Sequence, residues 1–149
     1  MKILERIRNR RLIRRYPFLK LPGGGCSCTW LDNMPEGWKK AFGVEMAEEL
    51  REILLKASEI DGVDWLREYN VCDVKEKWGR LRWDAAWPEC VDAEMREWLD
   101  KYEDLSWNTC VACGEKSDGR TTGWILPVCK SCAEKNGMAW VPFEERKDV

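Results

Sequence analysis

The chain has 149 residues, 44% of them hydrophobic, with ten tryptophans, no histidine and a formal net charge of −2. This length supports one globular domain, or one domain with a small appended module, and the tryptophans supply enough apolar surface for a core without disulfides. Because histidine is absent, the sequence excludes histidine general bases, Ser-His-Asp and Cys-His nucleophile systems and H-E-x-x-H metalloprotease sites.

An enzyme built from this sequence would depend on carboxylates, lysines or a thiolate, and no motif singles out any of the twenty-seven acidic residues. We therefore predict a protein without enzymatic activity. The sequence also has no apolar run long enough to span a bilayer and no apolar signal-peptide core, which predicts a cytosolic protein without a membrane partner. Thiols stay reduced in the cytosol, which favours metal ligation over disulfides.

Positive charge is concentrated at the start of the chain. Residues 1–20 hold eight Lys and Arg against one acidic residue, a net charge of +7, whereas the rest of the chain carries −9. Two interpretations remain open. The basic segment either contacts nucleic acid or another polyanion, or it is a solvated helix that lies on the protein's own acidic surface.

Residues 1–25 are predicted to be a basic helical arm followed by a linker. An apolar stripe that begins at Ile3 predicts a helix over residues 2–16. Pro17 and the P-G-G-G run that starts at Pro22 end this helix and predict a flexible link. The glycines are not a phosphate-binding loop by pattern, because no G-K-[ST] follows them.

The first long helix of the body is predicted from Asn33 to about Ile60. Asn33 has the position of an N-cap, followed by proline in the first turn and Glu36 three residues after the cap. Asp61-Gly62 ends the helix. Apolar residues at spacings of three and four would form its buried face: Phe42, Met46, Leu50, Ile53, Ala57 and Ile60.

A β-hairpin and a second helix complete the body, which spans residues 26–108. Alternating apolar and charged residues predict strands at about 69–77 and 80–86, joined at Trp78-Gly79. The second helix runs from Asp92, its predicted cap, to Leu105. The predicted fold class is α+β, with two main helices packed on a small antiparallel sheet and a C-terminal four-cysteine zinc ribbon.

The hairpin carries the candidate site for a ligand or partner. Strand alternation places Lys75 and Lys77 on one face, and Arg80 and Arg82 on one face of the next strand, beside Trp78. Guanidinium groups bind phosphate and an indole stacks on a base, so these residues suit an anionic ligand that carries a ring. Glu36 and Trp38 are predicted neighbours of this site. Alternatively, the cations protect an exposed sheet edge against aggregation.

Two C-x-x-C pairs give the most specific signal in the chain. Cys110, Cys113, Cys129 and Cys132 are separated by fifteen residues between the pairs, which is typical of a four-thiolate zinc site. We predict two knuckles joined by a β-hairpin, a zinc ribbon over residues 109–140, followed by a tail over 141–149. Four thiolates fill the tetrahedron, so the single Zn²⁺ is predicted to be structural. A redox dithiol and two disulfides are the alternatives.

The other four cysteines allow two interpretations. A second metal site would combine Cys26 and Cys28 with Cys72 and Cys90. Free cysteine is also common as a small buried apolar residue, and this is the interpretation we favour.

Four segments in order carry a resemblance to known proteins. They are E-G-W at 36–38, V-K-E-K-W-G-R-L-R-W at 74–83, C-x-x-C-G with T-x-G-W at 110–124, and P-x-C-x-x-C at 127–132. This combination resembles a group of small uncharacterised bacteriophage and prophage proteins that share K-E-K-[FW]-G-x-L-R-[FWY] and a C-terminal zinc ribbon. The resemblance spans residues 36–132. It implies a phage or prophage setting, the cytoplasm of a bacterial host and a zinc-bound accessory protein, and it implies no established activity.

The leading hypothesis is a non-enzymatic, zinc-stabilised accessory protein that captures a host protein or an anionic nucleotide-like ligand, by analogy to counter host defence. The alternative is a nucleic-acid-binding regulator that uses the basic arm and the ribbon. The pI near 5.4 and the acidic body count against this alternative. A small enzyme that depends on a carboxylate or a thiolate is a third hypothesis, and the sequence also allows a homo-oligomer.

Overall fold

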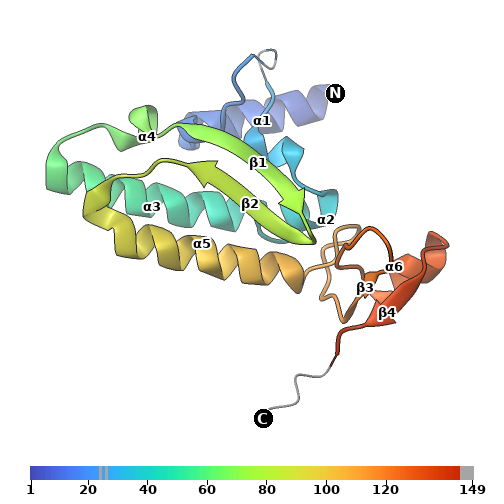
Figure 1. Ribbon diagram of the computed structural model, residues 1–149. Helices are drawn as coiled ribbons and strands as arrows, with labels where there is room; N and C mark the ends of the chain where they lie inside the picture. The colour runs from blue at the N-terminus through green and yellow to red at the C-terminus, as the bar shows by residue number, and fades with distance from the viewer. Residues whose placement is uncertain (24, 26, 145–149) are drawn as a thin grey trace, which may run out of the picture.

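A long β-hairpin lies across two long helices, and a small cysteine-containing module is attached at one end (Figure 1). The computed structural model describes residues 1–23, 25 and 27–144. The elements in chain order are α1 Ile3–Arg15, η1 Pro17–Leu19, η2 Trp30–Asn33, α2 Glu36–Trp38, η3 Lys39–Gly43, α3 Val44–Asp61, α4 Trp65–Glu68, β1 Val71–Lys77, β2 Arg80–Ala85, η4 Glu89–Val91, α5 Asp92–Trp107, β3 Gly119–Thr121, α6 Lys130–Lys135 and β4 Trp140–Pro142.

The body has one hydrophobic core between the hairpin and the helices α3 and α5, and the predicted α+β class is confirmed. Helix α5 packs against β2 and against α3. Trp83 of β2 meets Trp98 of α5 edge to face, with ring centroids 5.4 Å apart. Aromatic pairs in this geometry add to the free energy that burial alone provides. Trp83 and Trp98 therefore help to hold the hairpin against helix α5.

The first long helix is continuous from Glu36 to Asp61 but contains a π-helical segment, η3, in its second turn. The predicted N-cap at Asn33 is wrong, because Asn33 ends the short helix η2 and Pro35 precedes α2. The predicted stop is confirmed, since Gly62 adopts a left-handed φ of 76° at the C-cap. Of the predicted buried face, Ile60 is 56% exposed because it lies in the last turn.

Helix α1 is held against the body rather than projecting from it. Asn9 is 2% exposed, and its side-chain amide donates to the Ser27 carbonyl at 2.7 Å and to Asp32 Oδ2 at 2.9 Å. The predicted flexible link begins instead with η1, whose Phe18 and Leu19 are buried in the core. The remainder of this link includes residue 24, which lies outside the described residues.

The hairpin forms as predicted, with a two-residue turn at Trp78-Gly79. The register pairs Lys75 with Arg82 and Lys77 with Arg80. A bulge between Val71 and Asp73 shifts the alternation. Bulges add one residue to a strand, which explains why Val71 and Val74, three residues apart, both face the core.

Helix α5 begins at Asp92 as predicted, but Val91 holds the N-cap position. Asp92 instead accepts hydrogen bonds from the side chains of Trp87 and Arg96 at 2.8 Å each. Glu97 and Lys101 have the i,i+4 spacing of a helical ion pair, but Lys101 binds Glu49 of α3 at 2.5 Å instead. Contact with a neighbouring helix has replaced a contact along the same helix.

The C-terminal module differs in detail from the predicted ribbon. Strand β3 pairs with β4, which follows the second C-x-x-C pair and extends into the predicted tail. Residues 124–126, in the arm where the hairpin between the knuckles is predicted, form a loop that a single bridge, Arg120 with Pro127, closes. Residues 145–149 lie outside the described residues. Within the described chain, no helix has the length and apolar character needed to cross a membrane.

Candidate functional site

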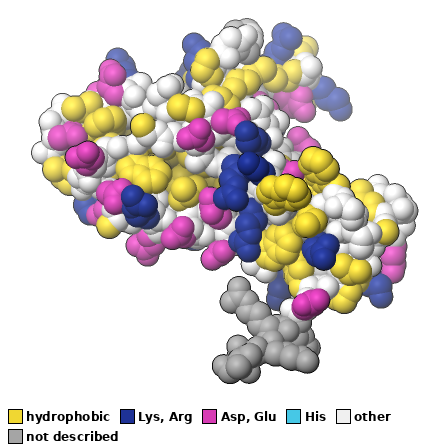
Figure 2. All heavy atoms as spheres, viewed as in Figure 1, with side chains coloured by type: hydrophobic (Ala, Val, Ile, Leu, Met, Phe, Trp, Pro, Cys, Tyr) yellow, Lys and Arg dark blue, Asp and Glu magenta, His cyan; other side chains and the backbone are white. Residues whose placement is uncertain are grey.

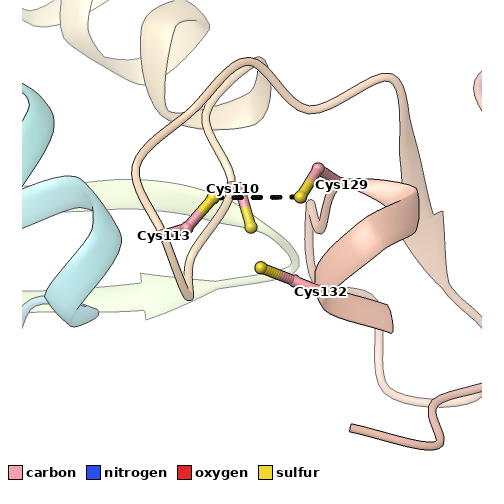
Figure 3. Close-up of side chains that lie close together, drawn as sticks. All are labelled: Cys110, Cys113, Cys129 and Cys132. Carbon is pink, nitrogen blue, oxygen red and sulfur yellow. Dashed lines mark hydrogen bonds between the residues drawn. The ribbon is translucent and has the colours of Figure 1, made fainter. Parts of the chain in front are cut away.

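The four cysteines of the two C-x-x-C pairs converge on one point (Figure 3). Their sulfur atoms all lie within 4.8 Å of one another, and Cys113 Sγ lies 3.8 Å from Cys129 Sγ. A tetrahedron with metal–sulfur bonds of about 2.3 Å has edges of about 3.8 Å, whereas a disulfide joins sulfurs about 2.05 Å apart. The cluster can therefore hold one metal ion.

Each C-x-x-C pair is placed by a different local structure. In the first, Gly114 follows Cys113 with a left-handed φ of 82°, and the backbone N–H of Glu115 donates to Cys113 Sγ at 3.4 Å. In the second, Cys129 is the N-cap of α6 and Cys132 lies in its first turn. The helix supplies the turn here, which explains why the second pair needs no glycine after it.

The protonation of the cluster favours a bound cation. Burial acts to raise the pKa of Cys110, but hydrogen bonds from backbone N–H groups of both knuckles outweigh it and lower this pKa to about 7. In contrast, hydrogen bonding to Cys129, and next to Cys113, raises the pKa of Cys132 to about 12. Four adjacent thiols cannot all ionise alone, whereas a divalent ion stabilises the thiolate form of each.

The remaining cysteines that the structure describes do not form a second cluster. Among the described residues, the metal-competent group contains only the four cysteines above. Cys72 is exposed on β1 and Cys90 is exposed at η4, where its thiol lies 3.8 Å from Asp61 Oδ2. Cys26, the fourth member of the second site considered above, lies outside the described residues.

The E-G-W segment joins the body to the C-terminal module that carries the four cysteines, called the metal module below. The backbone N–H of Gly37 donates to the Val111 carbonyl at 2.8 Å, and the indole N–H of Trp38 donates to the Thr109 carbonyl at 2.9 Å. A Cβ atom at Gly37 would lie 2.1 Å from the Cys110 carbonyl oxygen. Trp38 is fully buried, so the structure places it in this junction and not among the surface residues of the hairpin site. Glu36 is exposed at the start of α2.

Four cations predicted for the ligand site do share the outer face of the hairpin. Cross-strand pairing places Lys75 beside Arg82 and Lys77 beside Arg80. Three of the four contact carboxylates: Lys75 binds Asp73 at 2.5 Å, Arg80 binds Asp104 at 3.1 Å and Arg82 binds Glu103 at 3.4 Å. No carboxylate of the described residues lies within ion-pair distance of Lys77. Figure 2 shows Lys and Arg side chains gathered between the body and the metal module.

Arg80 has a structural role as well. Its guanidinium lies 5.3 Å from the centroid of the Trp107 ring, and that ring stacks on Phe143 with centroids 4.9 Å apart. Gly79 packs against the same indole, since a Cβ there would lie 2.6 Å from the Trp107 ring and 3.2 Å from Pro127. The hairpin turn is therefore seated on the end of α5 and on the metal module.

Two exposed tryptophans line a pocket at this seam. All ten tryptophans lie in the described residues, and only Trp78, at 69%, and Trp124, at 74%, are exposed. A pocket of about 440 Å³ is lined by the hairpin turn on one side and by the module's loop on the other: Glu76, Lys77, Trp78, Gly123, Trp124 and Ile125. This volume lies within the usual range for small-molecule sites.

The backbone at Trp78 is strained. Its φ of 55° is the one positive φ among the described residues other than glycine. Both turn residues need positive φ in this class of two-residue turn, which normally selects Asn-Gly. Strained backbone of this kind occurs preferentially at binding sites. Unlike the asparagine usual at this turn position, Trp78 places an indole at the edge of the pocket.

Trp124 and Ile125 were not predicted as site residues. The apolar run after Gly123 favours a strand of the predicted ribbon hairpin and not an exposed loop. One sequence feature could have indicated these residues: Trp124 stands next to Gly123 in T-T-G-W, just as Trp78 stands next to Gly79 in the hairpin turn. They lie opposite Trp78 only because the module packs against the hairpin turn, and local sequence patterns carry no information about that packing.

Comparison with known proteins identifies no relative: no family model, curated protein or solved structure matches the chain. The functional interpretation therefore rests on the chain's own geometry.

Proposed function

We propose that this chain is a zinc-stabilised, non-enzymatic binding protein that captures an anionic ligand bearing a planar ring, such as a nucleotide. The single observation that carries the proposal is the pocket between the hairpin and the metal module, where two exposed indoles lie beside Lys77. Exposed indoles cost free energy in water, and a ring stacked between them removes that cost.

Zinc is the metal proposed for the cysteine cluster. Four thiolates in a tetrahedral arrangement suit Zn²⁺, and a reducing compartment maintains them. Cys110 is buried and the other three ligands are half-buried. A complete set of four sulfur ligands leaves no position for water or substrate, so the proposed role of the ion is structural. It would hold the two knuckles, and through them the loop that carries Trp124.

The charges around the pocket support an anionic ligand. Lys77 lines the pocket, and Lys75, Arg80 and Arg82 extend the positive surface along the outer face of the hairpin. Lysine and arginine side chains contact phosphate oxygens while aromatic rings stack on a base. In the phage or prophage setting that the resemblance implies, the ligand would be a host nucleotide, with a host protein as the alternative occupant of the same surface.

Native mass spectrometry of protein purified without chelator tests the proposal first. We expect one zinc per chain and, where a ligand survives purification, an added mass in the nucleotide range. Titration calorimetry with ATP, GTP and a cyclic dinucleotide then measures affinity directly. The variants Trp124→Ala and Lys75→Gln with Lys77→Gln should each weaken binding by roughly tenfold or more, because each removes a stacking or charge contact.

The matched control is Lys116→Gln with Lys135→Gln, which removes two exposed lysines that do not line the pocket. Equal weakening in this control would indicate non-specific charge attraction and contradict the pocket. Arg80→Ala is unsuitable as a probe, because it would also remove the contact with Trp107. If none of the nucleotides binds the intact, zinc-loaded protein, the small-molecule proposal is wrong and a protein partner takes its place.

A further inference from the structure

Helix α1 exposes apolar side chains that the body does not cover. Ile3 is 76% exposed, Leu4 79% and Ile7 43%, and Val44 at the start of α3 is 42% exposed. The sequence pattern predicted these α1 residues as the helix's apolar side, yet the side that faces the body is anchored by the polar Asn9. Figure 2 shows hydrophobic side chains beside Lys and Arg along α1 at the top of the view.

Leu4, Ile7 and Val44 border a groove between α1 and the start of α3. The groove has a volume of about 560 Å³, with Leu4, Ile7, Leu12 and Val44 among its apolar lining and Arg8 and Arg11 beside them. Because two separate elements form its walls, the surface is concave. Helix-in-groove recognition uses such surfaces, in which apolar residues of the guest at i, i+3, i+4 and i+7 fill the groove.

The groove's charge is strongly positive and largely uncompensated. Arg15, at its end, is bound by Glu48 through two hydrogen bonds. For Arg8 and Arg11, no carboxylate of the described residues lies within ion-pair distance, and both side chains are exposed. An apolar floor with free guanidinium groups beside it complements a guest that is apolar on one side and acidic on its flanks.

We propose that the α1 groove, defined by Leu4, Ile7, Leu12, Val44, Arg8 and Arg11, is a docking site for an acidic amphipathic helix of a partner protein. A second copy of the same face would bring arginine against arginine and is disfavoured. Nucleic acid would leave the apolar residues uncovered. A lipid surface is flat and would not fill a groove with two walls. This site is separate from the Trp78–Trp124 pocket and does not depend on the proposed nucleotide ligand.

Fluorescence anisotropy of the full chain with a labelled peptide probe tests this proposal. The probe is a 15-residue helical peptide with leucines at i, i+3, i+4 and i+7 and glutamates on the flanks, compared with the same peptide carrying lysines. We expect binding of the glutamate peptide only. Arg8→Gln with Arg11→Gln, and separately Val44→Ser with Ile7→Ser, should each weaken it roughly tenfold. All four side chains are exposed, so the variants should fold.

The matched control is Arg10→Gln with Arg14→Gln, which removes the same charge from α1 outside the groove. Retained binding in this control supports the groove. An equal loss of affinity would indicate attraction to the net charge of the helix and overturn the proposal. It is also overturned if the glutamate peptide fails to bind, or if phosphatidylglycerol vesicles or a 20-base-pair DNA duplex bind more tightly through Arg8 and Arg11.

Discussion

At the scale of single residues, the strained backbone of Trp78 points to a candidate binding site. An L-residue with a left-handed backbone is strained by about 1 kcal/mol or more, and asparagine tolerates this conformation better than tryptophan. Trp78 has φ 55° and an indole that is 69% exposed, so neither the turn nor the core explains its identity. We propose that the pocket it shares with Trp124 explains it.

The substitution Trp78→Asn should therefore separate stability from binding. Asn-Gly is the preferred pair for this turn, so we expect the free energy of unfolding to rise by about 1 kcal/mol in urea denaturation. Nucleotide affinity should fall at least tenfold at the same time, because one stacking surface is lost. A variant that loses stability would show that the indole supports the fold. Unchanged affinity would remove Trp78 from the site.

Gly37 is the residue whose substitution should most directly separate the metal module from the body. In Gly37→Ala the new Cβ would meet the Cys110 carbonyl oxygen at 2.1 Å and main-chain atoms of Val111 at 2.7 Å, and neither can rotate away. We expect the free energy of unfolding to fall by about 2 kcal/mol, measured by denaturant unfolding.

Gly43→Ala is the control for this prediction. Its Cβ would approach only side-chain atoms of Leu31, at 3.5 Å, and Lys39, and alanine favours a helix over glycine by up to about 1 kcal/mol. Helix propensity therefore predicts a small gain in stability for Gly43→Ala, and similar destabilisation by both substitutions would show that any added side-chain volume along this helix disturbs the fold. The effect of Gly37→Ala would then not report on the junction between the body and the metal module.

At the scale of elements, sequence periodicity predicted the two long helices and the hairpin because each has a continuous apolar face. It predicted the helix caps poorly. Asn33 and Asp92 both have cap chemistry, yet other local structure uses them: Asn33 is the last residue of η2, and Asp92 accepts hydrogen bonds from the nearby side chains of Trp87 and Arg96. The strand β4 was not predicted, because it pairs with β3 across the second C-x-x-C pair and α6, and local sequence patterns do not reveal pairing between such distant segments.

The attachment of α1 to α3 should be sensitive to acid. The hydrogen bonds from Arg15, and next from Tyr16, lower the pKa of Glu48 from 4.5 to about 2. A lowered pKa means that this contact stabilises the fold fully above pH 4.5, and the contribution is lost as the pH falls toward 2. We expect Glu48→Gln to unfold with a shallower pH dependence than the parent between pH 4.5 and 2.

Urea denaturation of both proteins at a series of pH values measures this difference. Other lowered carboxyl pKa values, such as those of Asp61 and Asp92, affect both proteins equally and cancel in the comparison. Parallel pH profiles would show that the contact between α1 and α3 contributes nothing to stability.

At the scale of the whole molecule, the metal cluster was the part of the candidate site that spacing alone predicted well. Thiolate spacing encodes the coordination geometry directly, and the structure brings all four cysteines together. The cations of the hairpin were also predicted to share a face, because alternation fixes which side each residue takes. The role of Trp38 and the second wall of the pocket required the docked arrangement of body and module.

Removal of the metal should loosen the module while leaving most of the body helical. The module's own buried cluster contains only Cys110, Val128 and Ala133 in the described residues, too little to hold it without the ion. We expect a strong chelator to lower the melting temperature by roughly 10 °C, with most of the far-UV circular dichroism retained. Cys132→Ser should have the same effect.

Cys72→Ser is the matched control, because Cys72 is exposed on β1 outside the cluster. It should retain one zinc and the parent melting temperature. A melting temperature that chelation does not change would mean that the module folds without metal, and the proposed structural role of zinc would be wrong.

The pocket has one wall on the hairpin and the other on the loop of the metal module, so neither part alone contains it. On our proposal that zinc holds the module in its docked position, whatever binds there is thermodynamically linked to that ion. By reciprocity, a ligand that requires the docked module must tighten zinc binding by the same factor by which zinc tightens ligand binding. Under zinc scarcity the ligand would raise the fraction of protein that keeps its ion, and zinc-depleted protein would bind the ligand less tightly. Zinc supply would in this way set how much of the protein is able to bind.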